Sequence, residues 1–395
     1  MPCVRAEARQ DAYGNCTSMT TERAIALQEK AWELQAAGKL HDAILACREA
    51  IDLMTLSEGS ESADVANLLN DLAELQNEQQ DFPAALASAE RARKIQQASP
   101  SLWVGETLAT IRIKTQTLLG GIRRTLGEYD RSERDLREAL AIARAEFGER
   151  SEAAASARNE LGMLYKYVGR FEEGLQLYKQ ALEIFAEAHG EDSPQACTVY
   201  HNLGGILFAK GDFIVAERFA RRSWDISRKQ WGEESIPTMA DAVAYAAILD
   251  GLKRHAESEA IYRRALHIYE TRLGAEHYEV AAVLHNLAAV LVTCNRCEEA
   301  EQHYQRALAI KEKLLGSDSP DVALTRNNLG RLLIDIARPG EAVPLLTSAV
   351  AILEKGLLPG HPQLSSARNN LQNAIARGGV IVQGTTLPAT GFCES

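Results

Sequence analysis

The chain has 395 residues, a hydrophobic share of 46% and a formal net charge of −11 at pH 7. The acidic balance argues against a nucleic-acid partner, because phosphate binding needs a clustered positive surface. No apolar run approaches the roughly 18 residues of a membrane helix, and residues 1–20 lack the apolar core of a signal peptide. We therefore expect a cytoplasmic protein that binds neither nucleic acid nor membrane.

A short sequence pattern recurs nine times along the chain, and one marker position represents each copy. The markers are Glu29, Asp71, Leu118, Glu160, Asn202, Ala244, Asn286, Asn328 and Asn370. Successive markers are 42 residues apart, except for one step of 47 residues between the second and the third. A period of this size indicates an array of similar units, each packed on its neighbours.

Each unit is predicted to be a pair of helices joined by a turn. In the unit around Asn286, the first helical pattern ends near Asn295 and the second ends near Gly316. Other units place glycine in the first turn, at Gly38, Gly127, Gly169 and Gly211. Glycine just beyond a helix tolerates the left-handed conformation that ends it, and asparagine is the usual second choice.

Columns of small residues define the helix faces. Alanine, glycine or serine recurs two, fourteen and twenty-one positions after the marker, as at Ala73, Ala85 and Ala92 in the second unit. Small side chains at these positions let paired helices approach closely. A column of isoleucine or leucine, exemplified by Ile95, runs between them and forms a core stripe. These columns predict an all-α fold.

The same columns resemble the tetratricopeptide repeat, and the 42-residue period resembles its kinesin light chain type. The motifs that carry the resemblance are Asn327-Asn328-Leu329-Gly330, Arg306-Ala307-Leu308 and Gly360-His361-Pro362. The resemblance implies a right-handed superhelical solenoid of helix-turn-helix repeats. We expect eight helix pairs and a capping helix over residues 21–377, with disordered tails over 1–20 and 378–395.

Two irregular places interrupt or end the array. The five extra residues of the long step fall near residues 99–103, where Pro100 predicts a loop. This loop is either a tolerated insertion or a hinge or partner contact through Trp103. The ninth marker lies in a last helix, residues 361–377, which we expect to cover the open core of the eighth pair.

The motifs that suggest chemistry are weak. Leu387 to Gly391 reads as a sortase anchoring motif, but the segments that anchoring requires are absent, so we interpret it as coincidence. Cys294 and Cys297 form a single C-x-x-C, whereas a structural zinc site needs four ligands. No phosphate loop, nucleophile elbow or H-E-x-x-H motif is present. We expect no enzyme activity, no cofactor and no metal.

The polar column at the marker position is the better candidate site. In the resembled family this part of the first helix lines a concave groove, where asparagine offers a donor and an acceptor to an extended peptide. The candidate groove residues are Asn70, Asn159, His201, Asn202, His285, Asn286, Asn327, Asn328, Arg331, Asn369 and Asn370. The alternative is that these side chains bond only to adjacent helices within the stack.

The expected function is therefore a non-catalytic adaptor or scaffold that holds a protein or peptide segment in the groove. Chaperone-binding arrays of this fold use a lysine- and arginine-rich clamp, and here the corresponding positions hold mainly Lys114 and Arg331. That difference argues against a chaperone-tail adaptor. The alternative function is a regulatory sensor that binds a peptide or small ligand and controls a separate effector.

Overall fold

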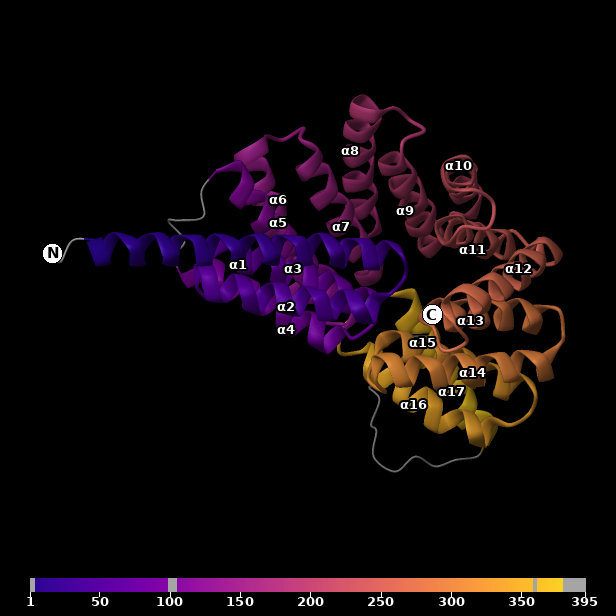
Figure 1. Cartoon of the computed structure of the whole chain (residues 1–395). Helices are drawn as coiled ribbons and strands as arrows, with labels where there is room; N and C mark the ends of the chain where they lie inside the picture. Colours follow the sequence, from indigo (N-terminus) through magenta and orange to yellow (C-terminus); the bar gives the residue numbers. More distant parts are fainter. Residues whose placement is uncertain (1–3, 99–104, 358–360, 379–395) are drawn as a thin grey trace, which may run out of the picture. The chain divides into compact units, whose positions relative to one another are not determined.

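The computed structural model describes residues 4–98, 105–357 and 361–378, with side chains from Met19 onward. These residues form α-helices and no strand, so the prediction of an all-α helix-pair repeat is confirmed (Figure 1). The insertion near Pro100 lies outside the described residues, and so does the predicted C-terminal tail, residues 378–395, except for Gly378, which ends the last helix.

Seventeen helices occupy the described ranges, and they alternate between the first and second helix of a pair. They are α1 (Val4–Ala36), α2 (Leu40–Glu58), α3 (Ala63–Glu78), α4 (Phe82–Ala98), α5 (Glu106–Thr125), α6 (Tyr129–Phe147), α7 (Glu152–Val168), α8 (Phe171–His189), α9 (Pro194–Lys210), α10 (Phe213–Trp231), α11 (Ile236–Gly251), α12 (His255–Leu273), α13 (Tyr278–Thr293), α14 (Cys297–Leu315), α15 (Pro320–Asp335), α16 (Pro339–Leu353) and α17 (Pro362–Gly378). Every marker lies in an odd-numbered helix.

The chain divides into two compact units, residues 1–278 and residues 279–395. In the first unit, each odd-numbered helix up to α11 packs against the even-numbered helix that follows it. In the second unit, α15 packs on α16, and α17 packs on both. Residue 20, predicted as the boundary of an N-terminal tail, lies inside the continuous helix α1.

The turns inside the pairs follow the predicted chemistry in part. Gly169 and Gly211 have φ of 83° and 89°, and Asn295 has φ of 61°. Gln80, Lys253 and Ala337 adopt the same left-handed conformation, which a side chain with a Cβ rarely takes. At these three turns the packing of the flanking helices selects the conformation against local preference.

The small-residue columns lie where helices cross. A Cβ built on Gly120 of α5 would lie 2.4 Å from Leu136 Cγ of α6, and one on Gly330 of α15 would lie 2.6 Å from Leu346 Cγ of α16. In close-packed interiors such an overlap forces the helices apart. The small residue two positions after the marker therefore determines how closely each pair packs.

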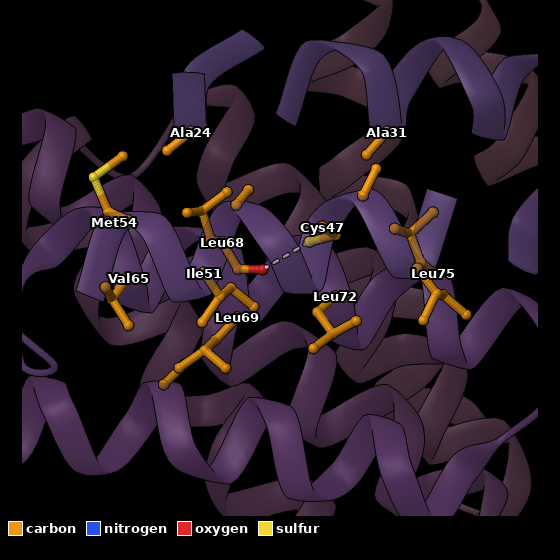
Figure 2. Packing of buried hydrophobic residues seen from close by; sticks show 14 of the residues in the cluster. Ala24, Ala31, Cys47, Ile51, Met54, Val65, Leu68, Leu69, Leu72 and Leu75 are labelled. Carbon is orange, nitrogen blue, oxygen red and sulfur yellow. Dashed lines mark hydrogen bonds between the residues drawn. The ribbon is translucent and has the colours of Figure 1, made fainter. Parts of the chain in front are cut away.

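The core of the first repeats shows the apolar stripes in place. Figure 2 shows Ala24 and Ala31 of α1 above Cys47 of α2 and the leucines of α3, all buried. The Cys47 thiol donates to the Leu68 carbonyl oxygen at 3.4 Å. Burial raises the pKa of Cys47 to about 12, with a further contribution from Asp71. This thiol is a small core side chain rather than a nucleophile.

Candidate functional site

The marker residues and the side chains four before, one before and three after them share one face of each odd-numbered helix. Within each of the two compact units, this surface is called the marker face below. Helix periodicity produces it, because positions three and four apart lie on the same side of a helix. In α1 the marker face carries Ile25, Glu29 and Trp32.

Asparagine side chains on this face bond from one repeat to the previous one. Asn202 Nδ2 donates to Asn159 Oδ1 at 2.9 Å, and Asn370 Nδ2 donates to Asn327 Oδ1 at 2.9 Å. The partners are 43 residues apart in both pairs. A marker thus contacts the residue that precedes the marker one repeat earlier, and the recurring asparagines tie successive first helices together.

The second marker, Asp71 of α3, accepts hydrogen bonds from the first helices of both neighbouring repeats. Gln28 Nε2 of α1 donates to Asp71 Oδ2 at 2.5 Å, and Lys114 Nζ of α5 donates to Asp71 Oδ1 at 2.8 Å. Burial alone would lower the pKa of Lys114, but the charge and hydrogen bonds of Asp71 and Glu74 raise it. This lysine, a cation predicted on the face, is therefore held by two carboxylates.

A buried polar contact joins the second and third repeats beneath the marker face. Thr115 Oγ1 of α5 donates to Asn70 Oδ1 at 2.9 Å, and Gln96 Nε2 of α4 donates to Thr115 Oγ1 at 2.6 Å. Asn70 is fully buried. Its side chain is therefore enclosed between two repeats.

The fifth and sixth repeats use the equivalent positions with different residues. His201 Nδ1 of α9 donates to Asp241 Oδ1 of α11 at 2.6 Å, and Ser223 of α10 donates to the same carboxylate. Cys197 lies 3.8 Å from this carboxylate. Burial, followed by the charge of Asp241, raises the pKa of Cys197 to about 12. The thiol stays protonated at neutral pH, so this group does not supply a thiolate nucleophile.

An equivalent polar contact joins the seventh and eighth repeats at His285 of α13. Asn328 Nδ2 donates to His285 Nε2 at 3.0 Å, and His285 Nδ1 donates to Thr325 Oγ1 at 3.0 Å. Lys311 Nζ of α14 donates to the same threonine oxygen at 3.2 Å. Burial, followed by the charge of Lys311, lowers the pKa of His285 well below its usual value. The ring is therefore neutral.

The remaining candidate residues lie closer to solvent. Asn286 is half-buried, and its side-chain amide makes no hydrogen bond within the described part of the chain. Arg331 and Asn369 are exposed, and Arg331 Nε lies 3.8 Å from Asp335 Oδ2. The candidate set therefore contains side chains enclosed between repeats and side chains that a ligand can reach.

Two large apolar side chains on the marker face were missed by sequence reasoning. Trp32 and Ile25 of α1 are 49% and 45% exposed. Ile25 lies four positions before Glu29 and Trp32 three positions after it, and this spacing was the available signal. Sequence reasoning sought polar residues at this face and so passed over them.

The remaining expectations from the sequence concern the cysteine pair, metal binding and membrane spans. Cys294 is exposed and Cys297 half-exposed, and both are free thiols. Across the described residues no group of three or more histidine, cysteine, aspartate or glutamate side chains is arranged to hold a metal ion. The helices in those ranges also include none with the length and apolar character to cross a membrane.

Comparison with known proteins identifies the repeat. A tetratricopeptide repeat family model matches residues 112–173, 154–229, 238–313 and 279–355, together more than half of the chain. No curated protein matches the sequence.

Two solved Rap protein structures share the fold at low sequence identity. A Rap protein complexed with Competence and Sporulation Factor is 12% identical, covers 90% of this chain and 98% of its own, and gives a TM-score of 0.58. The apo form of RapI is 17% identical over 74% and 98%, with a TM-score of 0.56. A putative kinesin light chain of Podosopora anserina is 22% identical over 52% and 97%, with a TM-score of 0.40.

Proposed function

Because the chain belongs to the tetratricopeptide repeat family, as its residue columns predicted, we propose that its marker face holds a segment of a partner protein. The chain would act as a non-catalytic adaptor or scaffold. The family and the repeat architecture support protein binding in general. The observation that carries the use of this particular face is the exposure of Trp32 and Ile25 beside the marker of α1.

These side chains suit a partner protein. A tryptophan that can be fully covered supplies apolar area at low entropic cost, which is why tryptophan is frequent at binding hot spots. In the second unit, the half-buried Asn286 amide retains donors and an acceptor for a peptide backbone. The bonded amides of Asn202 and Asn370 have a further role in this proposal, because they hold neighbouring helices in register and so pre-organise the face.

Selection of binding peptides tests this proposal. A displayed library of random peptides is selected on the full-length chain, and the affinity of the selected peptides is measured against Trp32→Ala and Asn286→Ala variants. We expect at least one variant to weaken binding by about tenfold, a change of about 1.4 kcal/mol.

The control variant removes an apolar side chain away from the face. Leu56 of α2 is more exposed than Trp32 and lies on a second-type helix. The Leu56→Ala variant should bind as the unchanged chain does. Peptides that bind all four proteins equally would place the binding surface elsewhere.

A second candidate function adds a response to the same binding event. A Rap protein, similar in fold, was solved in complex with Competence and Sporulation Factor, which favours a regulatory sensor as the alternative. A sensor requires a conformational change on binding. Small-angle scattering of the chain with and without a selected peptide separates a sensor from a static scaffold. Cytoplasmic localisation stays a prediction, to be checked by cell fractionation.

A further inference from the structure

A cleft of about 390 Å³ lies between the second helices of the third and fourth repeats. Two parallel rows of side chains form its walls, at positions i, i+3, i+4 and i+7 of each helix. Arg137, Leu140, Ala141 and Arg144 come from α6, and Glu173, Gln176, Leu177 and Gln180 come from α8. Leu161 and Tyr165 of α7 form the floor. They follow the marker Glu160 by one and five positions, so they lie on the flank of α7 that faces away from the marker face.

An arginine–glutamate cluster borders one end of the cleft. Arg137 Nη2 donates to the Tyr165 hydroxyl at 2.9 Å, and that hydroxyl donates to Glu133 Oε1 at 2.9 Å. Arg170 stacks over the Tyr165 ring at 3.9 Å and bonds both Glu133 and Glu173. Burial opposes ionisation of Glu133, but hydrogen bonds from Arg170, Tyr165 and Arg137 lower its pKa. This end is therefore charged and ordered.

The other end carries a second cluster of the same kind. Arg144 Nε lies 2.8 Å from Glu149 Oε2, and the buried Arg158 bonds both Glu149 and Gln180. The Arg137 and Arg144 side chains remain 59% and 45% exposed despite their bonds. The α6 wall therefore presents two cations to solvent, two helical turns apart, with apolar Leu140 and Ala141 between them.

Two residues that line the cleft are smaller than their equivalents one repeat later. The positions 42 residues after Ala141 and Leu177 hold Glu183 and Phe219. Phe219 stacks on Tyr200, with ring centroids 6.2 Å apart. The array therefore accommodates larger side chains at these positions without losing its helix pairing.

We propose that this cleft binds an amphipathic helix of a partner protein, with apolar side chains at its centre and two acidic side chains seven residues apart. Seven residues of helix rise about 10.5 Å, which matches the spacing of Arg137 and Arg144 on α6. Charge complementarity favours acidic side chains where the partner helix meets the α6 wall, because the exposed charges of that wall, Arg137 and Arg144, are positive. The exposed carboxylate of the α8 wall, Glu173, is already bonded to Arg170.

A helix fits the cleft better than an extended strand. The walls are helices, whose backbone groups are already bonded, so a strand would leave its own backbone N–H and C=O groups unpaired against them. A helix satisfies its backbone internally and places side chains at i, i+3, i+4 and i+7 against the two matching rows. The cleft is thus a second binding surface, and its argument does not depend on the proposed use of the marker face.

The test uses fluorescent helical peptides of about 14 residues, a length of about four turns. One panel carries two glutamates seven residues apart with leucine, isoleucine or phenylalanine between them, and a matched panel carries lysine in place of glutamate. Fluorescence anisotropy measures binding to the full-length chain. We expect saturable binding of the acidic panel, weakened by added salt, and at least about tenfold weaker binding of the lysine panel.

The decisive variant combines Ala141→Glu and Leu177→Phe, which fills the cleft with the residues that the next repeat carries. It should keep the helical circular dichroism of the unchanged chain and lose at least about tenfold in affinity for the acidic peptides. Trp32→Ala, on the marker face, should bind them unchanged. Absence of acidic-panel binding up to about 1 mM, or equal binding to the filled variant, would overturn the proposal. Arg144→Ala gives a second check, with a weaker salt dependence expected.

Discussion

The side-chain amides of Asn202, Asn328 and Asn370 each reach back to the previous repeat. An amide that bonds a buried neighbour contributes to stability chiefly because the neighbour would otherwise be left unpaired. Asn286 occupies the same register, and its side-chain amide has no hydrogen-bond partner among the described residues. The marker column therefore mixes amides that are bonded between repeats with an amide that is available to a ligand.

This difference predicts unequal effects of the same substitution. Asn202→Ala should lower the free energy of unfolding by about 1–3 kcal/mol, because it leaves the buried Asn159 carbonyl oxygen without its donor. Asn286→Ala should change it by less than about 0.5 kcal/mol. Urea denaturation followed by circular dichroism measures both, and equal losses would contradict the assignment of roles.

The neutral ring of His285 predicts a pH dependence of stability. The pKa of His285 in the folded chain lies below the unfolded value of about 6.5. As the pH falls, the unfolded chain therefore binds a proton at this residue before the folded chain does. Stability supplied by the neutral ring is present above about pH 6.5 and is lost as the pH falls below it. The chain should therefore unfold at a lower urea concentration at pH 5 than at pH 7.5.

The variant His285→Asn isolates this contribution. Asparagine already occupies the equivalent position in four repeats, at Asn70, Asn159, Asn327 and Asn369, and does not titrate in this range. The variant should show a smaller change in its urea midpoint between pH 5 and pH 7.5. An unchanged pH profile would assign the dependence to other groups.

At the scale of helices, two adjacent glycines of α5 have opposite surroundings. A Cβ on Gly120 would lie 2.4 Å from Leu136 Cγ, whereas a Cβ on Gly121 meets no atom within 4 Å. Gly120→Ala should destabilise the chain by about 1–2 kcal/mol, because overpacking outweighs the better helix propensity of alanine. Gly121→Ala should stabilise it by about 0.5–1 kcal/mol. Thermal unfolding of both variants decides, and a loss in both would mean that α5 tolerates no added methyl group on either face.

At the scale of the whole molecule, stability accumulates from contacts between neighbouring helices. The last helix, α17, buries Leu364, Ala367 and Ala374 and packs on α15 and α16. A chain that ends at residue 357 should unfold more easily than one that ends at Gly378, by about 3 kcal/mol or more, because apolar side chains on both sides of this contact become exposed. Urea denaturation and light scattering compare the two chains. Equal stability would show that α17 does not act as a cap.

Much of the fold was predictable from the residues themselves. The recurrence of small residues after each marker correctly indicated paired helices, and Gly169 and Asn295 correctly indicated turns. The left-handed turns at Gln80, Lys253 and Ala337 could not be predicted, because local preference argues against them and only the packing of the flanking helices selects them.

The candidate site was less predictable than the fold. Spacing placed Asn202 and Asn286 in the same register, but a sequence does not show which partner each side chain meets. The cleft beside Ala141 and Leu177 was not predicted either, since both read as ordinary apolar positions of a repeat.

The sequence by itself determined the repeat, the pairing of helices and the face on which the polar column lies, because these follow from periodicity along a single helix. Only the tertiary structure decided which asparagine side chains are hydrogen-bonded between repeats, that Trp32 stays exposed, and that a cleft opens between α6 and α8. Those outcomes depend on side chains about 42 residues apart in sequence that meet across helices. Contact between neighbours, rather than the identity of any one residue, separates the structural positions of this array from the positions open to a partner.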